Sequence, residues 1–195
     1  MFVIGGGIGS GKSAFGKILS EFGGLLIESD RIGHDVLEPS GAAFSDVAAR
    51  WPVAVKDGVI DRATLGSIVF SDEEQLAELE AVTHPAIRRR IEELIERADA
   101  PVVLEVPVLV PFVEGDDVVH VFIDSSRDLR LERAVARGGG EADVRRRMLA
   151  QAARDEWLAW ADRVIDNSGS PERLRVQARE LWQEFVPGPR DEVRQ

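Results

Sequence analysis

Residues 6–13 read Gly-Gly-Ile-Gly-Ser-Gly-Lys-Ser and match the phosphate-binding pattern G-x-x-x-x-G-K-[ST] in full. The short apolar run 2–4 comes just before this stretch, and apolar residues at helical spacing follow it at Phe15, Ile18, Leu19 and Phe22. A strand, a glycine-rich loop and a helix in this order direct backbone N–H groups and the positive end of the helix dipole at a polyphosphate. The stretch therefore predicts nucleotide binding rather than a glycine-rich turn with a surface lysine.

Within this loop each residue type has an expected role. We expect Lys12 to bridge the outer phosphates and the Ser13 hydroxyl to hold Mg²⁺. The residues expected to contact the nucleotide here are Gly7, Ile8, Gly9, Ser10, Gly11, Lys12, Ser13 and Ala14.

Composition narrows the class of protein. The chain of 195 residues has 44% hydrophobic and 30% charged residues, which is ordinary for a globular protein and most simply one domain. A net charge of −11 argues against nucleic-acid binding, which needs a basic face. No apolar run approaches the roughly 20 residues of a membrane span. We expect a cytoplasmic protein without nucleic-acid or membrane partners, either a monomer or a weak homo-oligomer.

Apolar and helical patterns alternate along the chain. The runs read as strands are 2–4, 25–27, 102–106, 118–123 and 164–165. Helical patterns lie between them, which is typical of right-handed βαβ crossovers. The near-continuous apolar character of the third and fourth runs suits strands buried on both faces. The sequence thus predicts an α/β fold, with a five-stranded parallel sheet flanked by helices.

The helical segments suggest how a single domain over 1–187 is organised. The predicted helices are 30–37, 42–51, 62–70, 72–82, 85–98, 127–137, 141–159 and 171–186, with a turn at Asp57-Gly58 and a break at Pro85. The core would comprise 1–29, 101–125 and 161–187, with a helical, substrate-covering insertion at about 30–100. A helical lid would span about 126–160, where Gly138–Gly140 is either a hinge or a plain flexible loop. Residues 188–195 are expected to be a disordered tail.

Two acidic residues follow predicted strands. Asp30 comes just past the second strand, where open α/β sheets place ligands. It could accept the proton of an attacking hydroxyl or orient that hydroxyl for in-line transfer. It could equally cap the next helix. Glu105 ends the third strand, a position suited to holding Mg²⁺. The length, the loop and these acids favour a small-molecule kinase over a GTPase, because no lysine beyond Lys56 can supply a guanine-reading motif.

The chain resembles the dephospho-CoA kinase family over nearly its whole length. The resemblance rests on several segments in order: 6–13, Glu28-Ser29-Asp30, 57–62 with 69–70, 79–88, Glu105-Val106-Pro107-Val108-Leu109, 151–154 and 161–169. It implies a P-loop kinase fold and transfer of the ATP γ-phosphate to the 3′-hydroxyl of dephospho-CoA, the last step of coenzyme A synthesis. The alternatives are a related kinase for another nucleotide or small hydroxyl compound, and a non-catalytic nucleotide-dependent regulatory module.

The resemblance also implies roles for residues outside the loop. Asp30, Lys12 and Arg137 would be catalytic, and Ser13 and Glu105 would hold the metal. Arg137 and Arg154 would face the transferring phosphoryl group, and Asn167 would lie beside the adenine. The acceptor would contact Asp30, His84, Arg88, Pro107 and Leu109, although His84 could instead be a turn residue ahead of Pro85.

Four positions depart from the family pattern. Gly5 and Ala14 stand where threonine is usual, but neither change removes a backbone N–H. Pro111 replaces an acidic residue after the 105–109 segment, which affects the expected acceptor pocket. Gly138 replaces an aspartate after the lid arginine, which predicts looser lid closure.

Overall fold

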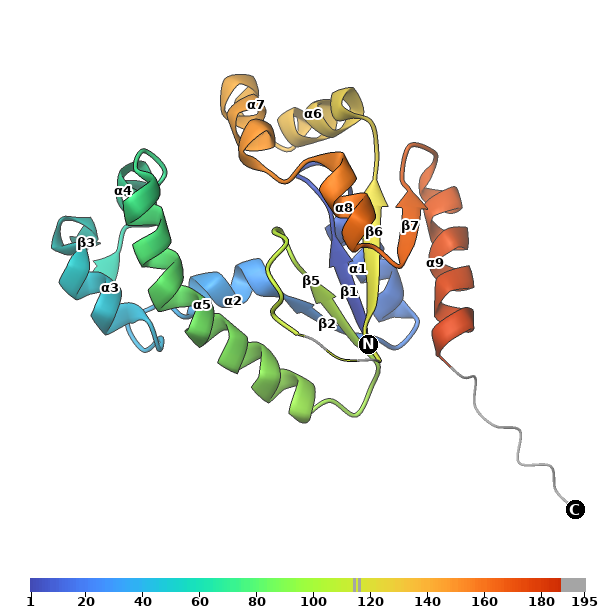
Figure 1. Ribbon diagram of the computed structural model, residues 1–195, viewed down its shortest axis with the longest axis horizontal. Helices are drawn as coiled ribbons and strands as arrows, with labels where there is room; N and C mark the ends of the chain where they lie inside the picture. The colour runs from blue at the N-terminus through green and yellow to red at the C-terminus, as the bar shows by residue number, and fades with distance from the viewer. Residues whose placement is uncertain (114, 116, 187–195) are drawn as a thin grey trace, which may run out of the picture. The chain divides into compact units, whose positions relative to one another are not determined.

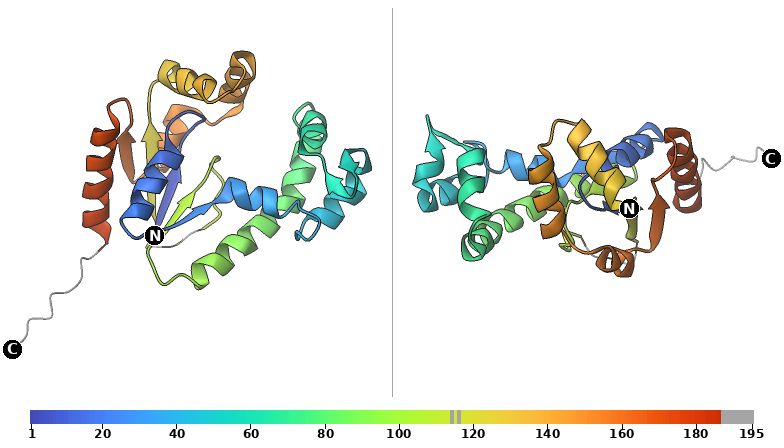
Figure 2. Two further views of the ribbon diagram at one scale, coloured as in Figure 1. Left: turned by 180° about the vertical axis from the view of Figure 1, so that it is seen from behind. Right: turned by 90° about the horizontal axis from the view of Figure 1, so that it is seen from above.

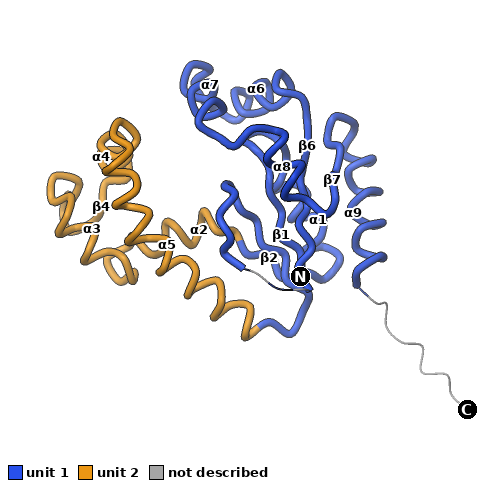
Figure 3. The backbone as a smooth tube through the Cα atoms, viewed as in Figure 1, with its two compact units in different colours: residues 1–27, 98–195 blue, residues 28–97 orange. Residues whose placement is uncertain are grey.

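The computed structural model describes residues 1–113, 115 and 117–186, and the chain forms two compact units (Figure 3). The first unit combines Met1–Ile27 with the chain from Ala98 onward, and the second is Glu28–Arg97. The tail predicted at 188–195 lies outside the described residues.

A five-stranded sheet organises the first unit, in the order β2-β5-β1-β6-β7 (Figure 1). The strands are β1 (Phe2–Gly5), β2 (Leu25–Glu28), β5 (Val102–Glu105), β6 (Val119–Asp124) and β7 (Arg163–Asp166). β1 pairs in parallel with β5 and β6, and β6 pairs in parallel with β7. The predicted parallel sheet is confirmed, and no strand end differs from its predicted position by more than one residue.

Alternation along the strands directs side chains to both faces of the sheet. Phe2 and Ile4 face one side, where α1 (Lys12–Glu21) and α9 (Pro171–Phe185) bury Phe15, Leu19, Leu174, Ala178 and Leu181 against them. Figure 2 shows α1 on the side of the sheet opposite α8 (Arg154–Trp160). On the α8 side, the Trp157 ring stacks on Phe122 with centroids 5.8 Å apart. The sheet is therefore covered on both faces, as its apolar strands predict.

The segment after β6 forms two further helices before α8. These are α6 (Arg127–Ala136), capped by the Ser126 hydroxyl, and α7 (Glu141–Ala150). The prediction of one helix over 141–159 is wrong, because Gln151–Ala153 lies between α7 and α8 and includes extended backbone. Asp155 and Glu156 explain the new start, since acidic residues stabilise a first helical turn. The Glu156 carboxylate accepts from the Ala153 N–H at 2.7 Å.

The second unit is mainly helical. Its elements are α2 (Ser29–Asp35), α3 (Phe44–Arg50), the 3₁₀ turn η1 (Pro52–Ala54), β3 (Val55–Lys56), β4 (Val59–Ile60), α4 (Arg62–Val69) and α5 (Glu73–Glu96). The predicted turn at Asp57-Gly58 joins β3 and β4 in a small hairpin that was not predicted. Both turn residues have positive φ, at 52° and 77°, which the two-residue hairpin turn requires.

α5 runs through Pro85 without a break, so the two helices predicted over 72–82 and 85–98 are one. A proline inside a helix removes one backbone hydrogen bond and crowds the preceding turn. Thr83, Ile87 and Ile91 are buried at four-residue intervals across the proline. This continuous packing stripe holds the helix together despite the lost bond. Within residues 1–113, 115 and 117–186, no helix is long and apolar enough to cross a membrane.

Candidate active site

The glycine-rich loop joins β1 to α1 at the carboxyl end of the central strand. Gly6, Gly9 and Gly11 have φ values of 144°, 78° and 102°, which residues other than glycine rarely adopt. Gly11 is the N-cap of α1 and has no side chain to occupy the first N–H groups of the helix. The loop thus presents backbone donors together with the positive end of a helix dipole.

Ser13 and Glu105, the two predicted metal ligands, lie together. β5 pairs with β1 so that Glu105 is opposite Ile4, which brings the end of β5 beside the loop. The Ser13 hydroxyl donates to Glu105 Oε1 at 2.9 Å, and Glu105 is buried. A hydroxyl and a carboxylate are hard oxygen donors of the kind that Mg²⁺ prefers. The pair therefore fits a magnesium ion bound next to a phosphate.

Three side chains from distant elements contact the loop from outside. The Asn167 amide donates to Ser10 O at 2.7 Å, and it follows β7 directly. Gln151 accepts from the Ile8 N–H at 2.8 Å, and Arg130 Nε donates to Ile8 O at 3.0 Å. Sequence reasoning did not identify Arg130 or Gln151 as site residues, because it placed Gln151 inside a continuous helix. The acidic pair after Arg154 is the signal that could have revealed the helix break.

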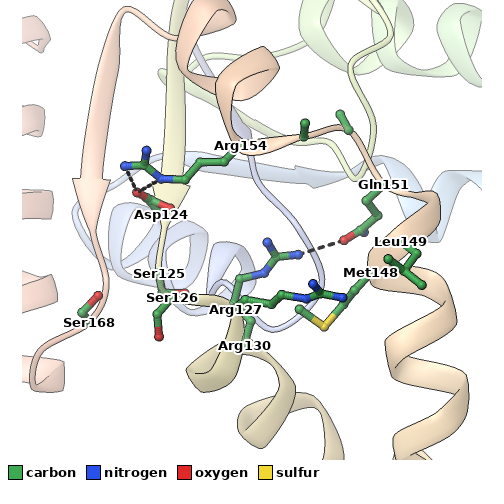
Figure 4. Close-up of a pocket in the computed structure, with 12 residues that line it drawn as sticks. Asp124, Ser125, Ser126, Arg127, Arg130, Met148, Leu149, Gln151, Arg154 and Ser168 are labelled. Carbon is green, nitrogen blue, oxygen red and sulfur yellow. Dashed lines mark hydrogen bonds and ion pairs between the residues drawn. The ribbon is translucent and has the colours of Figure 1, made fainter.

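A pocket of about 500 Å³ lies beside these contacts (Figure 4). Asp124, Ser125, Arg127, Arg130, Gln151 and Arg154 are among the residues that line it. The Arg154 guanidinium donates twice to Asp124 Oδ2, at 2.9 and 2.8 Å, which raises the pKa of Arg154. Burial lowers the pKa of Arg130 from its usual value. The pocket thus combines three arginines with the carboxylate of Asp124, the residue that ends β6.

Small polar groups also line this pocket. Ser125 is buried, and among the described residues its hydroxyl has no hydrogen-bond partner. Ser168 lines the pocket next to Asn167. A hydroxyl in a buried position normally has a partner, so a ligand atom would satisfy Ser125.

The remaining predicted residues of the first unit lie in other surroundings. Arg137 is exposed at the end of α6, where its Nε donates to Arg133 O at 3.2 Å. Pro107 and Leu109 follow β5 and are half-buried, and Leu109 lines a second cavity of about 270 Å³. Their roles toward substrates stay predictions.

Asp30, His84 and Arg88 belong to the second unit. Asp30 is the second residue of α2, and the N-cap of that helix is Glu28. The capping role considered for Asp30 is therefore not the one that it has, and its side chain is exposed. His84 and Arg88 lie one turn apart on α5, so the alternative of a turn residue ahead of Pro85 is wrong. Contact of these three residues with a substrate stays a prediction.

The sheet, the loop between β1 and α1, and the Ser13–Glu105 pair define a P-loop kinase. Comparison with known proteins narrows this class. Residues 1–172 match the family model described as dephospho-CoA kinase. The chain therefore belongs to the dephospho-CoA kinase family.

Individual relatives agree with this assignment. Dephospho-CoA kinases from Thermobifida fusca and Streptomyces avermitilis are 42% and 40% identical, covering 92% and 93% of this chain and 93% and 91% of theirs. Among solved structures, a protein from Thermus thermophilus aligns with a TM-score of 0.82 and 32% identity, over 95% of this chain and 97% of the other. Dephospho-CoA kinase from Campylobacter jejuni aligns with a TM-score of 0.63 and 27% identity, over 96% and 97%.

More distant structures share only the fold. A shikimate kinase from Acinetobacter baumannii is 15% identical with a TM-score of 0.52, over 95% of this chain and 92% of the other. The predicted P-loop kinase fold, the enzyme class of ATP-dependent phosphotransferase and the dephospho-CoA kinase function in coenzyme A synthesis are thus confirmed at the level of the family.

Proposed function

We propose that this chain transfers the γ-phosphate of ATP to the ribose 3′-hydroxyl of dephospho-CoA, giving CoA and ADP. The observation that carries the proposal is the assembled phosphate loop, with the Ser13–Glu105 contact at 2.9 Å, in a chain of this family. Phosphoryl transfer needs little covalent chemistry from the protein, so positioning and charge neutralisation are its main tasks.

The donor side is formed by residues of the first unit. Backbone N–H groups of the loop and the Lys12 ammonium would hold the outer phosphates of ATP. The pocket beside the loop would take the nucleoside, with Asn167 near the adenine as the family resemblance implies. Arg154 would exchange its Asp124 partner for phosphate oxygens, since a guanidinium pairs with either anion through the same fork of N–H donors.

Ser13 and Glu105 would hold Mg²⁺. When bound, the ion neutralises charge on the phosphate oxygens. The Ser13 hydroxyl would then turn a lone pair to the ion in place of its present hydrogen bond to Glu105. Glu105 carries the negative charge that balances the cation.

Asp30 would accept the proton of the attacking 3′-hydroxyl or orient that hydroxyl for attack. Its exposed carboxylate in the first turn of α2 supports this role, because a base must be accessible to substrate. Arg137 would add charge at the transferring phosphoryl group. His84, Arg88, Pro107 and Leu109 would contact the acceptor. A cytoplasmic location, the absence of nucleic-acid and membrane partners, and a monomeric or weakly oligomeric state also stay predictions.

A coupled ADP-release assay tests the proposal, with dephospho-CoA compared against a panel of nucleoside monophosphates and no acceptor. We expect rapid ADP release with dephospho-CoA only, and none after Mg²⁺ is chelated. Preference for another acceptor would show a related kinase of different specificity. ATP binding without acceptor-dependent release would show a regulatory module, and either result would overturn the proposed function.

A further inference from the structure

Arg130 and Gln151 together hold the backbone N–H and C=O of one residue of the phosphate loop, Ile8. Gln151 Oε1 accepts from the Ile8 N–H at 2.8 Å and from Arg130 Nη2 at 3.1 Å, while Arg130 Nε donates to Ile8 O at 3.0 Å. The three groups form a closed ring of hydrogen bonds. Figure 4 shows the two side chains meeting at the pocket wall.

The chemistry of the partners determines how this ring is oriented. A backbone N–H and a guanidinium are donors only, so the group between them must be an acceptor, and the amide oxygen of Gln151 is the one that fits. Arg130 is half-buried, and burial lowers its pKa, but an arginine remains charged at neutral pH. The ring thus places a fixed positive charge directly against the outside of the phosphate loop.

The neighbouring glycines show how tightly Arg130 packs against the loop. A Cβ atom at Gly7 would overlap the Arg130 guanidinium, and one at Gly9 would overlap the backbone carbonyl of Arg130. Gly7 does not share the positive φ of Gly9. A side chain at position 7 would therefore displace the Arg130 guanidinium from this ring, whereas the backbone conformation of Gly7 does not itself call for glycine.

We propose that Arg130 and Gln151 are positioning residues that hold the loop in its phosphate-binding conformation before ATP arrives. In this arrangement the Ile8 N–H donates to Gln151 and the Ser10 N–H donates to Gly7 O at 3.1 Å, while the N–H groups of Gly9 and of residues 11–13 would receive the phosphates. Preorganised donors favour binding because less ordering is left to occur when the ligand enters. The inference rests on the proposed binding of ATP by this loop.

Arg130 and Gln151 also connect the loop to the segment predicted to be a lid. Arg130 lies on α6, and Gln151 is the first residue after α7. Arg133, one turn after Arg130, donates to Asn167 O at 2.9 Å, and the Asn167 amide holds Ser10 O. α6 therefore supports the loop at two points, through Ile8 directly and through Asn167.

The test replaces Gln151 by Met, which keeps the length of the side chain and removes its acceptor, and compares affinities for AMP, ADP and ATP by calorimetry. We expect ADP and ATP to bind roughly five- to fiftyfold more weakly, since the part-buried Ile8 N–H is left without its partner. AMP, which lacks the outer phosphates, should lose less than about threefold. The KM for ATP should rise by a similar factor, and the KM for dephospho-CoA should stay unchanged.

Two further variants separate positioning from general stability. Gln151→Glu keeps an acceptor for both donors, so hydrogen exchange of residues 6–11 in the ligand-free protein should stay as slow as in the wild type, whereas Gln151→Met should speed it. Arg130→Lys should also speed exchange, because one ammonium cannot reproduce the two separate donors of the fork. Arg175→Met, which removes an ion pair with Glu21 away from the pocket, is the matched control and should change neither readout.

Equal losses for AMP, ADP and ATP in Gln151→Met would overturn the inference, and so would wild-type exchange at residues 6–11. A wild-type protein that fails to bind ATP would instead contradict the proposed function, so the two failures are distinguishable.

Discussion

The phosphate loop and the helical second unit are built in opposite ways. The loop is backbone held in place by buried or half-buried side chains from α6, from the residue after β7 and from the α7–α8 connection. In the second unit (Figure 3), Asp30 and Arg88 are exposed side chains on helices whose buried residues lie elsewhere on their surface. Under the proposed function, the loop would position the phosphates of ATP, and the exposed groups of the second unit would contact the acceptor. Substitutions in the two regions should therefore impair different properties of the protein.

Asp30→Asn should have the largest effect. Loss of a base or of hydroxyl orientation costs roughly 10²–10⁴-fold in rate. ATP affinity should stay within about twofold of the wild type, since the variant leaves the phosphate loop unchanged. Single-turnover kinetics with calorimetric ATP titration measure both. Weak ATP binding with a nearly normal transfer rate would assign Asp30 to the donor side instead.

Lys12→Ala should reduce the rate by at least roughly 10²–10³-fold, as expected for removal of one preorganised charged donor. In contrast to Asp30→Asn, this variant should also bind ATP more weakly. The measurement is kcat together with the ATP dissociation constant, with circular dichroism to verify the fold. Turnover close to that of the wild type would refute the assignment of the loop.

A pair of glycine substitutions compares the packing of the two regions. Gly7→Ala should destabilise the protein by roughly 1–3 kcal/mol, because the new methyl group overlaps the Arg130 guanidinium. Gly33→Ala in α2 should stabilise it by roughly 0.5–1 kcal/mol, because alanine favours the helical conformation. The added Cβ would meet Ile87 Cδ1 at an ordinary 3.6 Å. Urea denaturation measures both changes, and equal effects would show that the loop is not closely packed.

The smallest effect concerns Asp61, the N-cap of α4. Its side chain accepts from Ala63 N and Thr64 N, and hydrogen bonds from Lys56 and then Thr64 lower its pKa from 3.8 to about 2. A lowered pKa in the folded state stabilises the protein above pH about 4, and this contribution is lost as the pH falls from about 4 to 2.

Asp61→Ala should therefore lower the Tm at neutral pH, and the difference from the wild type should shrink below pH about 4. Thermal unfolding at a series of pH values measures this. Lys56→Met is the matched control and should move the loss to higher pH, because it removes the largest cause of the shift. A difference that is constant with pH would show that the pKa of Asp61 is not lowered.

The parts of the fold that sequence predicts best are those with strong local signals. The apolar runs predicted the strands of the sheet, and the glycine-rich pattern predicted that Lys12 and Ser13 lie at the end of the phosphate loop. The continuous helix through Pro85 was missed because a buried stripe of Thr83, Ile87 and Ile91 outweighs the local effect of proline. The break at residues 151–153 was missed because alanine-rich sequence has high helix propensity.

The residues of the candidate site also differ in how far local sequence signals predict them. Glu105 was predicted as a metal ligand from its position at the end of a strand, because the carboxyl ends of parallel strands meet at one edge of the sheet. The pairing of β5 with β1, which brings Glu105 to Ser13, came from the structure. The contacts of Arg130 and Gln151 with Ile8 connect residues more than a hundred positions apart in the chain. No local pattern records such contacts, so they became visible only in the structure.

The most direct test of the central claim is the position of the transferred phosphate. ³¹P NMR and mass spectrometry of the product formed from ATP and dephospho-CoA should show one phosphate added at the ribose 3′-hydroxyl, with one ADP formed for each CoA. An otherwise identical acceptor without the 3′-hydroxyl should give no product. Phosphate at another position, or ADP formed at the same rate without acceptor, would contradict the account.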